Sequence, residues 1–445
     1  MDRLRYWFLR HGTGVLHGAR RRLTPGGWLA LACLIGSAAL GIDTNQSMAY
    51  QAFCLVIELF ALSCAAALAW RPRFSAARRL PRFGTAGVPL PYTATVRNEG
   101  RKVLRETVLL DEAADPRPDF AQFSAAKTMP GDNPLERLFG AARWRRLLGP
   151  RLHESQAGRP VPDLVGGAAV DAALTLVPHK RGVLRLEALT LGRPDPLGLV
   201  NGLARRSLPQ SVVILPKRYP VPRLDLPGAR RHQPGGVSQA SRIGDSQEFM
   251  SLRDYRPGDP LRRVHWRSWA KTGEPVVKEY QDEFFTRHAL ILDTFAPPGG
   301  SAAFEEAVSV AASFACTLLT QESLLDLLFL EKDVVRVTAG RGQGGVSGML
   351  EVLACAQPSA RPFADLRISV SRRRETLSAC LVVLLAVDEE RRALLAELRG
   401  AGIPVLAAVV AGPESVSDAV CAAQGLRRLE PGRIEHGLAA LGDFT

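Results

Sequence analysis

The sequence lacks the cysteine patterns that mark many metal sites and secreted domains. Its seven cysteines are an odd number, and none has the spacing of a metal site. Three of them, Cys33, Cys54 and Cys64, lie in apolar segments near the N-terminus. We therefore expect neither a disulfide framework nor a zinc site, which fits a soluble part in the cytoplasm.

Two catalytic signatures are also missing. There is no Gly-x-x-x-x-Gly-Lys-[Ser/Thr] phosphate-binding loop, and the glycine-rich run 340–345 lacks the lysine, as is typical of an ordinary loop. There is no Gly-x-Ser-x-Gly nucleophile elbow either. We therefore expect a chain that is not an enzyme and holds no cofactor.

The composition excludes two broad classes of protein. Hydrophobic residues at 46% and charged residues at 23% are ordinary for a globular protein and exclude global disorder. A mean hydropathy of 0.00 excludes a polytopic transporter. The 57 basic and 44 acidic residues leave a net charge of +13, so the position of the excess positive charge matters.

Two apolar segments near the N-terminus predict a transmembrane helical hairpin over residues 23–70. Residues 27–42 carry no charge, and residues 48–70 carry one, Glu58. A span needs about 20 apolar residues, which the second segment has and the first reaches by including residues 23–43. Glu58 is either a functional carboxyl within the bilayer or one that is protonated or paired inside the hairpin.

Arginines flank both apolar segments and predict their orientation. Residues 1–22 contain six arginines and residues 71–82 contain five, whereas the link 43–47 has no basic residue. Positive charge resists translocation, so we expect both termini in the cytoplasm, with 1–22 as a basic cytoplasmic N-terminus. These arginines favour an anionic lipid surface as a partner, and no nucleic acid.

The segment 84–215 has the alternation of an all-β, sandwich-like module. Apolar and polar residues alternate over 92–97, 107–111, 173–177 and 183–191, with turns rich in Gly, Pro and Asn between them. An insertion over 115–167 lacks this alternation. Its centre, 135–148, predicts a basic amphipathic helix that lies on the cytoplasmic leaflet, unless the insertion is simply solvated and poorly ordered.

The last third of the sequence, 284–445, predicts a doubly wound α/β domain. Apolar strands at 289–293, 324–330, 380–387 and 404–410 alternate with helices at 302–320, 346–354 and 389–399. Near-continuous apolar strands that alternate with helices are typical of a parallel sheet. Asp293 and Asp388 end two of these strands, and ligands of such sheets bind beyond the carboxyl ends of the strands.

The segment 216–283 contains the densest charged motif. From Gly244 to Glu283 there are seven basic and eight acidic residues, so this is not a nucleic-acid-binding stripe. Opposite charges that alternate with aromatic residues predict partly buried ion pairs, in which Arg253, Arg256 or Arg262 contacts a nearby carboxylate. The motif residues are Glu248, Phe249, Arg253, Tyr255, Gly258, Asp259, Arg262, His265 and Trp266.

This motif resembles the signature of the bacterial family known as domain of unknown function 58. The resemblance extends to Asp195–Leu199 at the end of the β-module and to the N-terminal hairpin. It implies a protein of the bacterial inner membrane with a degenerate von Willebrand factor A-like domain. It also implies a partner, a MoxR-type AAA+ ATPase, because members are typically encoded beside such ATPases.

The resemblance bears on metal binding as well. Von Willebrand A domains often bind a divalent ion through an Asp-x-Ser-x-Ser loop after the first strand, with a second Asp from a later loop. Here the loop reads Asp293-Thr-Phe295-Ala-Pro297, so both hydroxyl positions are lost. Asp293 and Asp388 are therefore only weak metal candidates, and two strand-end aspartates that cap helices are the preferred interpretation.

Three functions remain open at this point. The leading hypothesis is a membrane-anchored, non-enzymatic adaptor or scaffold that works with a MoxR-type ATPase in protein-complex assembly or envelope maturation. The second is a divalent-ion-dependent protein-binding module at Asp293 and Asp388. The third is a hydrolase centred on His265, because Asp259 and Ser268 supply the other residue types of a triad.

Overall fold

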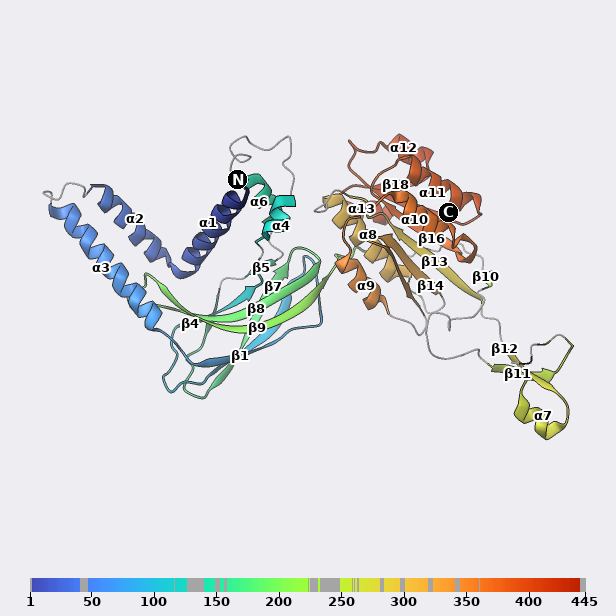
Figure 1. The fold of residues 1–445 in the computed structure, drawn as a ribbon, viewed down its shortest axis with the longest axis horizontal. Coiled ribbons are helices and arrows are strands. Elements are labelled where there is room, and N and C mark those ends of the chain that lie inside the picture. Colours follow the sequence, from blue (N-terminus) through green and yellow to red (C-terminus); the bar gives the residue numbers. More distant parts are fainter. Residues whose placement is uncertain are drawn as a thin grey trace. The chain divides into compact units, whose positions relative to one another are not determined.

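A computed structural model describes the chain apart from residues 1, 41–46, 116, 126–139, 149–152, 156–157, 223, 225–230, 233–248, 258, 260, 262–263, 281–283, 297–300, 319–322, 341–344, 360 and 441–445 (Figure 1). The chain divides into two compact units, residues 1–217 and residues 218–445. All seven cysteines carry free thiols.

Three helices begin the first unit: α1 (Asp2–Arg22), α2 (Pro25–Leu40) and α3 (Ser47–Ala69). Within the described residues, one helix is long and apolar enough to cross a membrane, over Tyr50–Ala69, with a mean hydropathy of 2.3. The apolar part of α2 is shorter, and α2 packs against α3. Glu58 lies exposed on α3. The basic N-terminal residues form the long helix α1.

The predicted all-β module consists of two sheets. One has the order β1-β3-β7-β5 and the other β2-β9-β8-β4-β6. The strands are β1 (Phe74–Arg79), β2 (Phe83–Thr85), β3 (Leu90–Asn98), β4 (Thr107–Ala113), β5 (His153–Ser155), β6 (Arg159–Val161), β7 (Ala169–Pro178), β8 (Gly182–Pro194) and β9 (Asn201–Leu215). All described pairs are antiparallel except β2 with β9.

One hydrophobic core joins the two sheets. Tyr92, Ala94 and Val96 of β3 point inward while the residues between them are more exposed, so the alternation in the sequence becomes the two faces of a strand. Leu184 and Leu186 of β8 enter the same core from the other sheet. The module begins with β1 at Phe74, which is buried, and not at residue 84. The sequence did not indicate β1 because the arginines in this segment resemble the basic flank of a membrane helix.

The segment 115–167 is partly built into this module. It contributes β5 and β6 to the two sheets, and two short helices, α4 (Phe120–Ala125) and α6 (Ala141–Leu148). Part of the helix predicted over 135–148 lies outside the described residues. In the described part, Trp144 is only 3% exposed and its ring lies 6.0 Å from that of Phe123. This part of the segment therefore faces protein and not lipid.

The second unit contains a mixed sheet with the order β15-β14-β13-β16-β17-β18. Its strands are β13 (Phe284–Leu292), β14 (Ser323–Leu330), β15 (Val334–Ala339), β16 (Ala379–Leu384), β17 (Val405–Val410) and β18 (Leu426–Leu429). Five of these are parallel, β15 runs antiparallel to β14, and the short β10 (Arg231–His232) pairs antiparallel with β13. The predicted strands and the parallel sheet are confirmed, and β15 and β18 are additional.

Helices connect these strands and cover the sheet. They are α8 (Ala302–Leu318), α9 (Val346–Cys355), α10 (Phe363–Ser371), α11 (Glu389–Gly400), α12 (Asp418–Ala423) and α13 (Ile434–Ala439). Ala289 and Ile291 of β13 share a core with α10 and α11. The chain continues from β13 toward β14 on one side, and β16 lies on the other, so the strand order reverses between β13 and β16. Such a reversal creates a crevice at the carboxyl ends of the two strands.

The charged motif forms a separate two-stranded hairpin. It consists of β11 (Phe249–Asp254) and β12 (Val276–Tyr280), which pair antiparallel, with α7 (Trp266–Thr272) between them. Glu248, Gly258 and Arg262 of the motif lie outside the described residues. We call residues 249–280 the signature hairpin.

Candidate functional site

The signature hairpin is closed by backbone hydrogen bonds and a small apolar centre. Tyr255 donates its backbone N–H to Pro275 at 2.9 Å, and His265 donates to Val276 at 2.8 Å. Val264 and Val277 are both buried and pair as an isolated bridge. The segment between the two strands is therefore folded back on the hairpin.

An ion pair fixes the turn of this hairpin. Arg253 donates from Nη1 and Nη2 to the two carboxylate oxygens of Asp259, each at 2.8 Å, and the backbone N–H of Arg256 donates to Asp259 at 2.9 Å. The Arg253 guanidinium lowers the pKa of Asp259 to about 2. The ion pair expected for Arg253 is present, but it is partly exposed, at 33% for Arg253 and 16% for Asp259.

Two tryptophans form an apolar surface on α7. The rings of Trp266 and Trp269 stack with their centroids 5.3 Å apart and an interplanar angle of 20°. Trp266 is 60% exposed, and Leu252 and Leu261 of the same hairpin are exposed as well. Trp266 therefore presents much of its ring to solvent. Large exposed aromatic side chains on a rigid support are typical of protein-binding surfaces.

The three hydrolase candidates do not form a relay. His265 Nδ1 lies 2.6 Å from the Ser268 hydroxyl oxygen. The Asp259 carboxylate accepts from Arg253 and Arg256 instead of orienting the imidazole. A Ser-His-Asp mechanism needs the carboxylate on one ring nitrogen and the hydroxyl on the other, so the observed contacts do not supply it.

Asp293 lies at the reversal between β13 and β16, at the carboxyl end of β13, as the sequence predicted. It is fully buried and accepts from the backbone N–H groups of Phe295 and Leu385, both at 3.0 Å. It therefore ties the loop after β13 to the end of β16. It does not cap a helix, in contrast to the sequence-based interpretation.

Arg391, in the first turn of α11, joins the two candidate metal ligands. Its Nε donates to Asp293 at 2.6 Å and its Nη2 donates to the same carboxylate at 3.2 Å, while Nη1 contacts Asp388. Asp388 also accepts from the backbone N–H of Arg391 at 2.9 Å, so Asp388 is the N-cap of α11, as expected. The guanidinium carbon lies 4.7 Å from the centroid of the Phe363 ring.

These contacts show how the buried charge of Asp293 is compensated. Burial lowers the pKa of Arg391, but the hydrogen bond and the charge of Asp293 outweigh it, so that the pKa is raised above its ordinary value. Both oxygens of Asp293 are already used by backbone N–H groups and the guanidinium. Among the described residues there is no group of three or more His, Cys, Asp or Glu side chains suited to a metal ion. The side chains at this strand end therefore do not fit a divalent cation.

Sequence reasoning missed Arg391. The signal was available, because an Asp N-cap followed three residues later by Arg places a guanidinium over the first turn of α11. What the sequence did not provide was the partner, since Asp293 lies 98 residues earlier in the chain.

The motif Asp195–Leu199 forms a tight turn that contacts the chain just before α2. The Asp195 carboxylate accepts from the backbone N–H groups of Leu197, Leu199 and Val200 at 2.9, 2.7 and 2.7 Å. Partial desolvation opposes these hydrogen bonds, yet they lower the pKa of Asp195. On the other side of the turn, Thr24 donates its N–H to the Leu199 carbonyl at 3.2 Å, just before α2.

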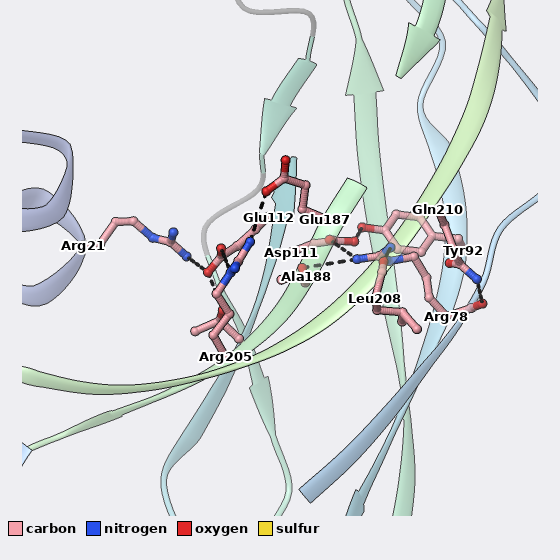
Figure 2. A network of polar contacts seen from close by, with 11 residues as sticks. Arg21, Arg78, Tyr92, Asp111, Glu112, Glu187, Ala188, Arg205, Leu208 and Gln210 are labelled. Carbon is pink, nitrogen blue, oxygen red and sulfur yellow. Dashed lines mark hydrogen bonds and ion pairs between the residues drawn. The ribbon is translucent and has the colours of Figure 1, made fainter. Parts of the chain in front are cut away.

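A second set of contacts holds the end of α1 to the β-module (Figure 2). Arg21 donates to Glu112 of β4 at 2.7 Å, and Arg205 of β9 donates to the same carboxylate at 2.9 Å and to Glu187 at 3.1 Å. Thr190 also donates to Glu112. Desolvation opposes these bonds, but together they lower the pKa of Glu112.

A buried pair beside this network joins the two sheets, with Arg78 on β1 of one sheet and Asp111 on β4 of the other. Arg78 donates to Asp111 and to the carbonyl groups of Ala188 and Leu208, and Tyr92 donates to Asp111 at 2.6 Å (Figure 2). Burial raises the pKa of Asp111 despite these donors. The first network holds the end of α1 to β4, and the second holds the two sheets to each other.

The comparison with protein families matches a part of the second unit. The model of the family "Protein of unknown function DUF58" matches residues 251–411, which contain both the Arg253–Asp259 pair and the Asp293–Arg391 pair. The "Uncharacterized protein YeaD" of Bacillus subtilis (strain 168) is 27% identical over 231 residues. That match covers 51% of this chain and 56% of the relative, so the chain spans only about half of the length of that protein.

Solved structures give only weak likeness. The CARDB domain of the PF1109 protein from Pyrococcus furiosus, solved with di-metal ions, is 12% identical, with 33% of this chain and 90% of that chain covered and a TM-score of 0.18. A beta-glucosidase from Listeria innocua, solved with gluconolactone, is 13% identical, with 32% and 16% covered and a TM-score of 0.18. Scores this low carry no argument about fold or function.

Proposed function

Because the family match and the distant homologue support the family of unknown function DUF58, we propose that this chain is a membrane-anchored, non-enzymatic adaptor. It works with a MoxR-type AAA+ ATPase in the assembly of protein complexes or the maturation of the envelope. Its site is the bacterial inner membrane, with α2 and α3 as a hairpin and both termini in the cytoplasm. The span-length helix over Tyr50–Ala69 and the flanking arginines support this location.

The observation that carries the proposal is the stacked tryptophan pair of the signature hairpin, in which the Trp266 ring is exposed. Trp266 and Trp269 stack on α7, and the Arg253–Asp259 pair fixes the turn of the hairpin that precedes this helix. A preorganised aromatic surface loses little conformational entropy when it binds, so it is well suited to a protein partner. Tryptophan and arginine are also the residues that most often dominate binding energy at protein interfaces.

The α/β sheet supports a degenerate von Willebrand factor A-like domain as part of this proposal. The sheet has parallel strands around a reversal between β13 and β16, with one antiparallel edge strand, β15. Asp293 stands at the carboxyl end of the first strand, where the metal loop of such a domain begins. Since the Arg391 guanidinium contacts Asp293 and Asp388, we propose that the domain binds its partner without a metal ion.

Affinity purification of the full chain from native membranes tests the adaptor function. Wild-type chain is expected to recover a MoxR-type ATPase, identified by mass spectrometry, and Trp266→Ala is expected to lose it. The control is Val420→Ala on α12, which removes a similarly exposed apolar side chain outside the signature hairpin and should retain the ATPase. Repeated absence of any AAA+ protein from wild-type preparations would contradict the proposal.

A further inference from the structure

Helix α1 has one face that is committed to the protein. The Tyr6 ring packs on the rings of Phe120, Phe123 and Trp144, with centroids 5.5, 5.8 and 5.9 Å away. Phe123 and Trp144 are buried, so Tyr6 packs against a buried aromatic cluster. These contacts fix which side of α1 faces the β-module.

Ion pairs at both ends prevent α1 from rotating about its axis. Arg143 of α6 donates to Asp2 at 3.0 Å at the start of the helix. Arg21 donates to Glu112 at the end of the helix, 2.7 Å away (Figure 2). In the middle, Arg117 donates to the Arg10 carbonyl at 3.2 Å. Because these contacts fix the orientation of α1, its opposite face points away from the β-module.

That outward face is apolar. Its side chains recur at intervals of three to four residues, as expected for one stripe of a helix: Leu4, Trp7, Phe8 and Val15. Trp7 is 56% exposed and Phe8 is 68% exposed. The His11 ring stacks on Trp7 with centroids 4.4 Å apart and lies on the same stripe. We call these five residues the α1 apolar stripe.

The α1 apolar stripe is followed along the chain by the exposed apolar side chains of the proposed membrane hairpin. Only Leu23 and Thr24 separate α1 from α2, and α2 in turn exposes Trp28, Leu29 and Ile35. Yet α1 itself contains six arginines, which exclude it from crossing the hydrocarbon core. A helix with an apolar stripe, many arginines and low overall hydrophobicity is typical of one that lies in the membrane interface.

We infer that α1 is an interfacial helix whose apolar stripe inserts among the lipids of the leaflet that the hairpin enters. The inference rests on the proposed membrane anchoring and deepens it. Arg3, Arg20 and Arg22 are exposed on α1 and complement anionic headgroups. Through Tyr6 and Glu112, the helix fixes the β-module against the bilayer, so that the module is oriented as well as tethered.

The inference assigns the lipid contact to α1, whereas the sequence predicted it for the helix over 135–148. The basic helix predicted near residues 135–148 has the composition of a surface helix, but in its described part Trp144 is buried against Tyr6. Helix α6 thus packs against the protein-facing side of α1, and α1 presents the apolar stripe on its other side.

Quenching of Trp7 fluorescence in bilayers tests the inference. The full chain is reconstituted in vesicles of phosphatidylcholine and phosphatidylglycerol in which the acyl chains are brominated near the headgroup. The difference between wild type and Trp7→Phe isolates the Trp7 signal, which is expected to lose most of its intensity in brominated vesicles and to resist aqueous acrylamide. The matched control is the difference for Trp144→Phe, which neither quencher should reduce.

Each outcome separates the inference from the proposed function. If the chain does not float with the vesicles, the membrane anchoring itself fails. If the chain floats but acrylamide quenches Trp7, the anchor holds and the interfacial role of α1 is wrong. If neither bromine nor acrylamide quenches Trp7, protein covers the stripe, in a second copy or another partner, and the inference is overturned.

A second variant guards against an indirect effect of the Trp7 substitution. The double variant Leu4→Gln, Phe8→Gln changes two exposed side chains and keeps Tyr6 and Arg21 in place. Its thermal unfolding midpoint in detergent should match wild type, whereas quenching of Trp7 by bromine should fall strongly. Unchanged bromine quenching in this variant would contradict insertion of the stripe.

Discussion

At the scale of single residues, two ion pairs that differ in burial carry different roles. Arg391 and Asp293 are both buried, so this pair holds the first turn of α11 to the end of β13 where water cannot compensate either charge. Arg253 and Asp259 are partly exposed, so this pair shapes a turn and contributes less to stability. The following two predictions use this difference.

Arg391→Ala is expected to destabilise the second unit by about 3–5 kcal/mol, because it leaves the buried Asp293 carboxylate without its cation. Removal of the guanidinium also vacates the space between Asp293 and Asp388, so Mg²⁺ or Mn²⁺ is expected to raise the melting temperature of this variant and not that of wild type. Thermal unfolding with and without metal measures both effects. The control is Arg392→Ala, which removes the exposed neighbour. An unchanged melting temperature in Arg391→Ala would refute the role of the pair.

The Arg253–Asp259 pair predicts a specific acid transition of the signature hairpin. The pKa of Asp259 is lowered from 3.8 to about 2, so the folded state favours the carboxylate. The stabilisation is therefore fully present above pH 3.8 and is lost as the pH falls through about 2. The Trp266 fluorescence, isolated by subtraction of a Trp266→Phe variant, should change in this window. Asp259→Asn should remove the transition and Asp254→Asn should keep it; the same transition in both variants would show that another group controls it.

At the scale of elements, the junction between α1 and α2 contacts the β-module at one tight turn. Leu23 pairs with Val200 as an isolated bridge, and Thr24 bonds to the Leu199 carbonyl. The Asp195 carboxylate shapes the turn from inside by accepting three backbone N–H groups. The chain just before α2 is thus attached to the 195–200 turn by backbone hydrogen bonds. These bonds form only if the two backbones approach closely.

Gly27→Ala is expected to disturb this junction. A Cβ atom at Gly27 would lie 2.1 Å from the Leu199 carbonyl oxygen, so backbone must shift, at a cost of about 1–3 kcal/mol. Gly26→Ala is the matched control, because its Cβ would lie 3.5 Å from the Gly198 oxygen, an ordinary contact. Thermal unfolding of the full chain in detergent compares the two variants. Equal melting temperatures would mean that the turn yields without cost.

At the scale of the whole molecule, the chain contains two units with separate cores. One core lies between the two sheets of the β-module, and another lies between the second unit's sheet and helices α10 and α11. Units with their own cores generally unfold on their own.

Calorimetry of the full chain in detergent is therefore expected to show two transitions. Phe123→Ala removes a buried ring from the first unit and should lower one transition. Arg391→Ala should lower the other and leave the first unchanged. If both variants shifted a single common transition, the two units would be thermodynamically coupled, and this prediction would be wrong.

Local patterns were sufficient for most elements of the two units. Alternation over 92–97 and 183–191 predicted strands of the β-module, and apolar runs predicted β13, β14, β16 and β17 with helices between them. Strand β1 was missed, because its arginines read as a flank although Arg78 is buried on Asp111. Strand β15 was missed because an edge strand has no continuous apolar run.

For the candidate sites, the sequence by itself determined which residue types are present and which elements carry them. It predicted that Asp293 follows a strand and that Asp388 lies between a strand and a helix, and it showed that a charged, aromatic motif precedes the sheet. Only the tertiary structure decided that Arg391 lies between the two aspartates, that Trp266 is exposed, and that α1 and not α6 presents an apolar stripe. The physical reason is that helical and strand periods are local, whereas the partner of a buried charge and the buried face of a helix depend on segments far away in the chain.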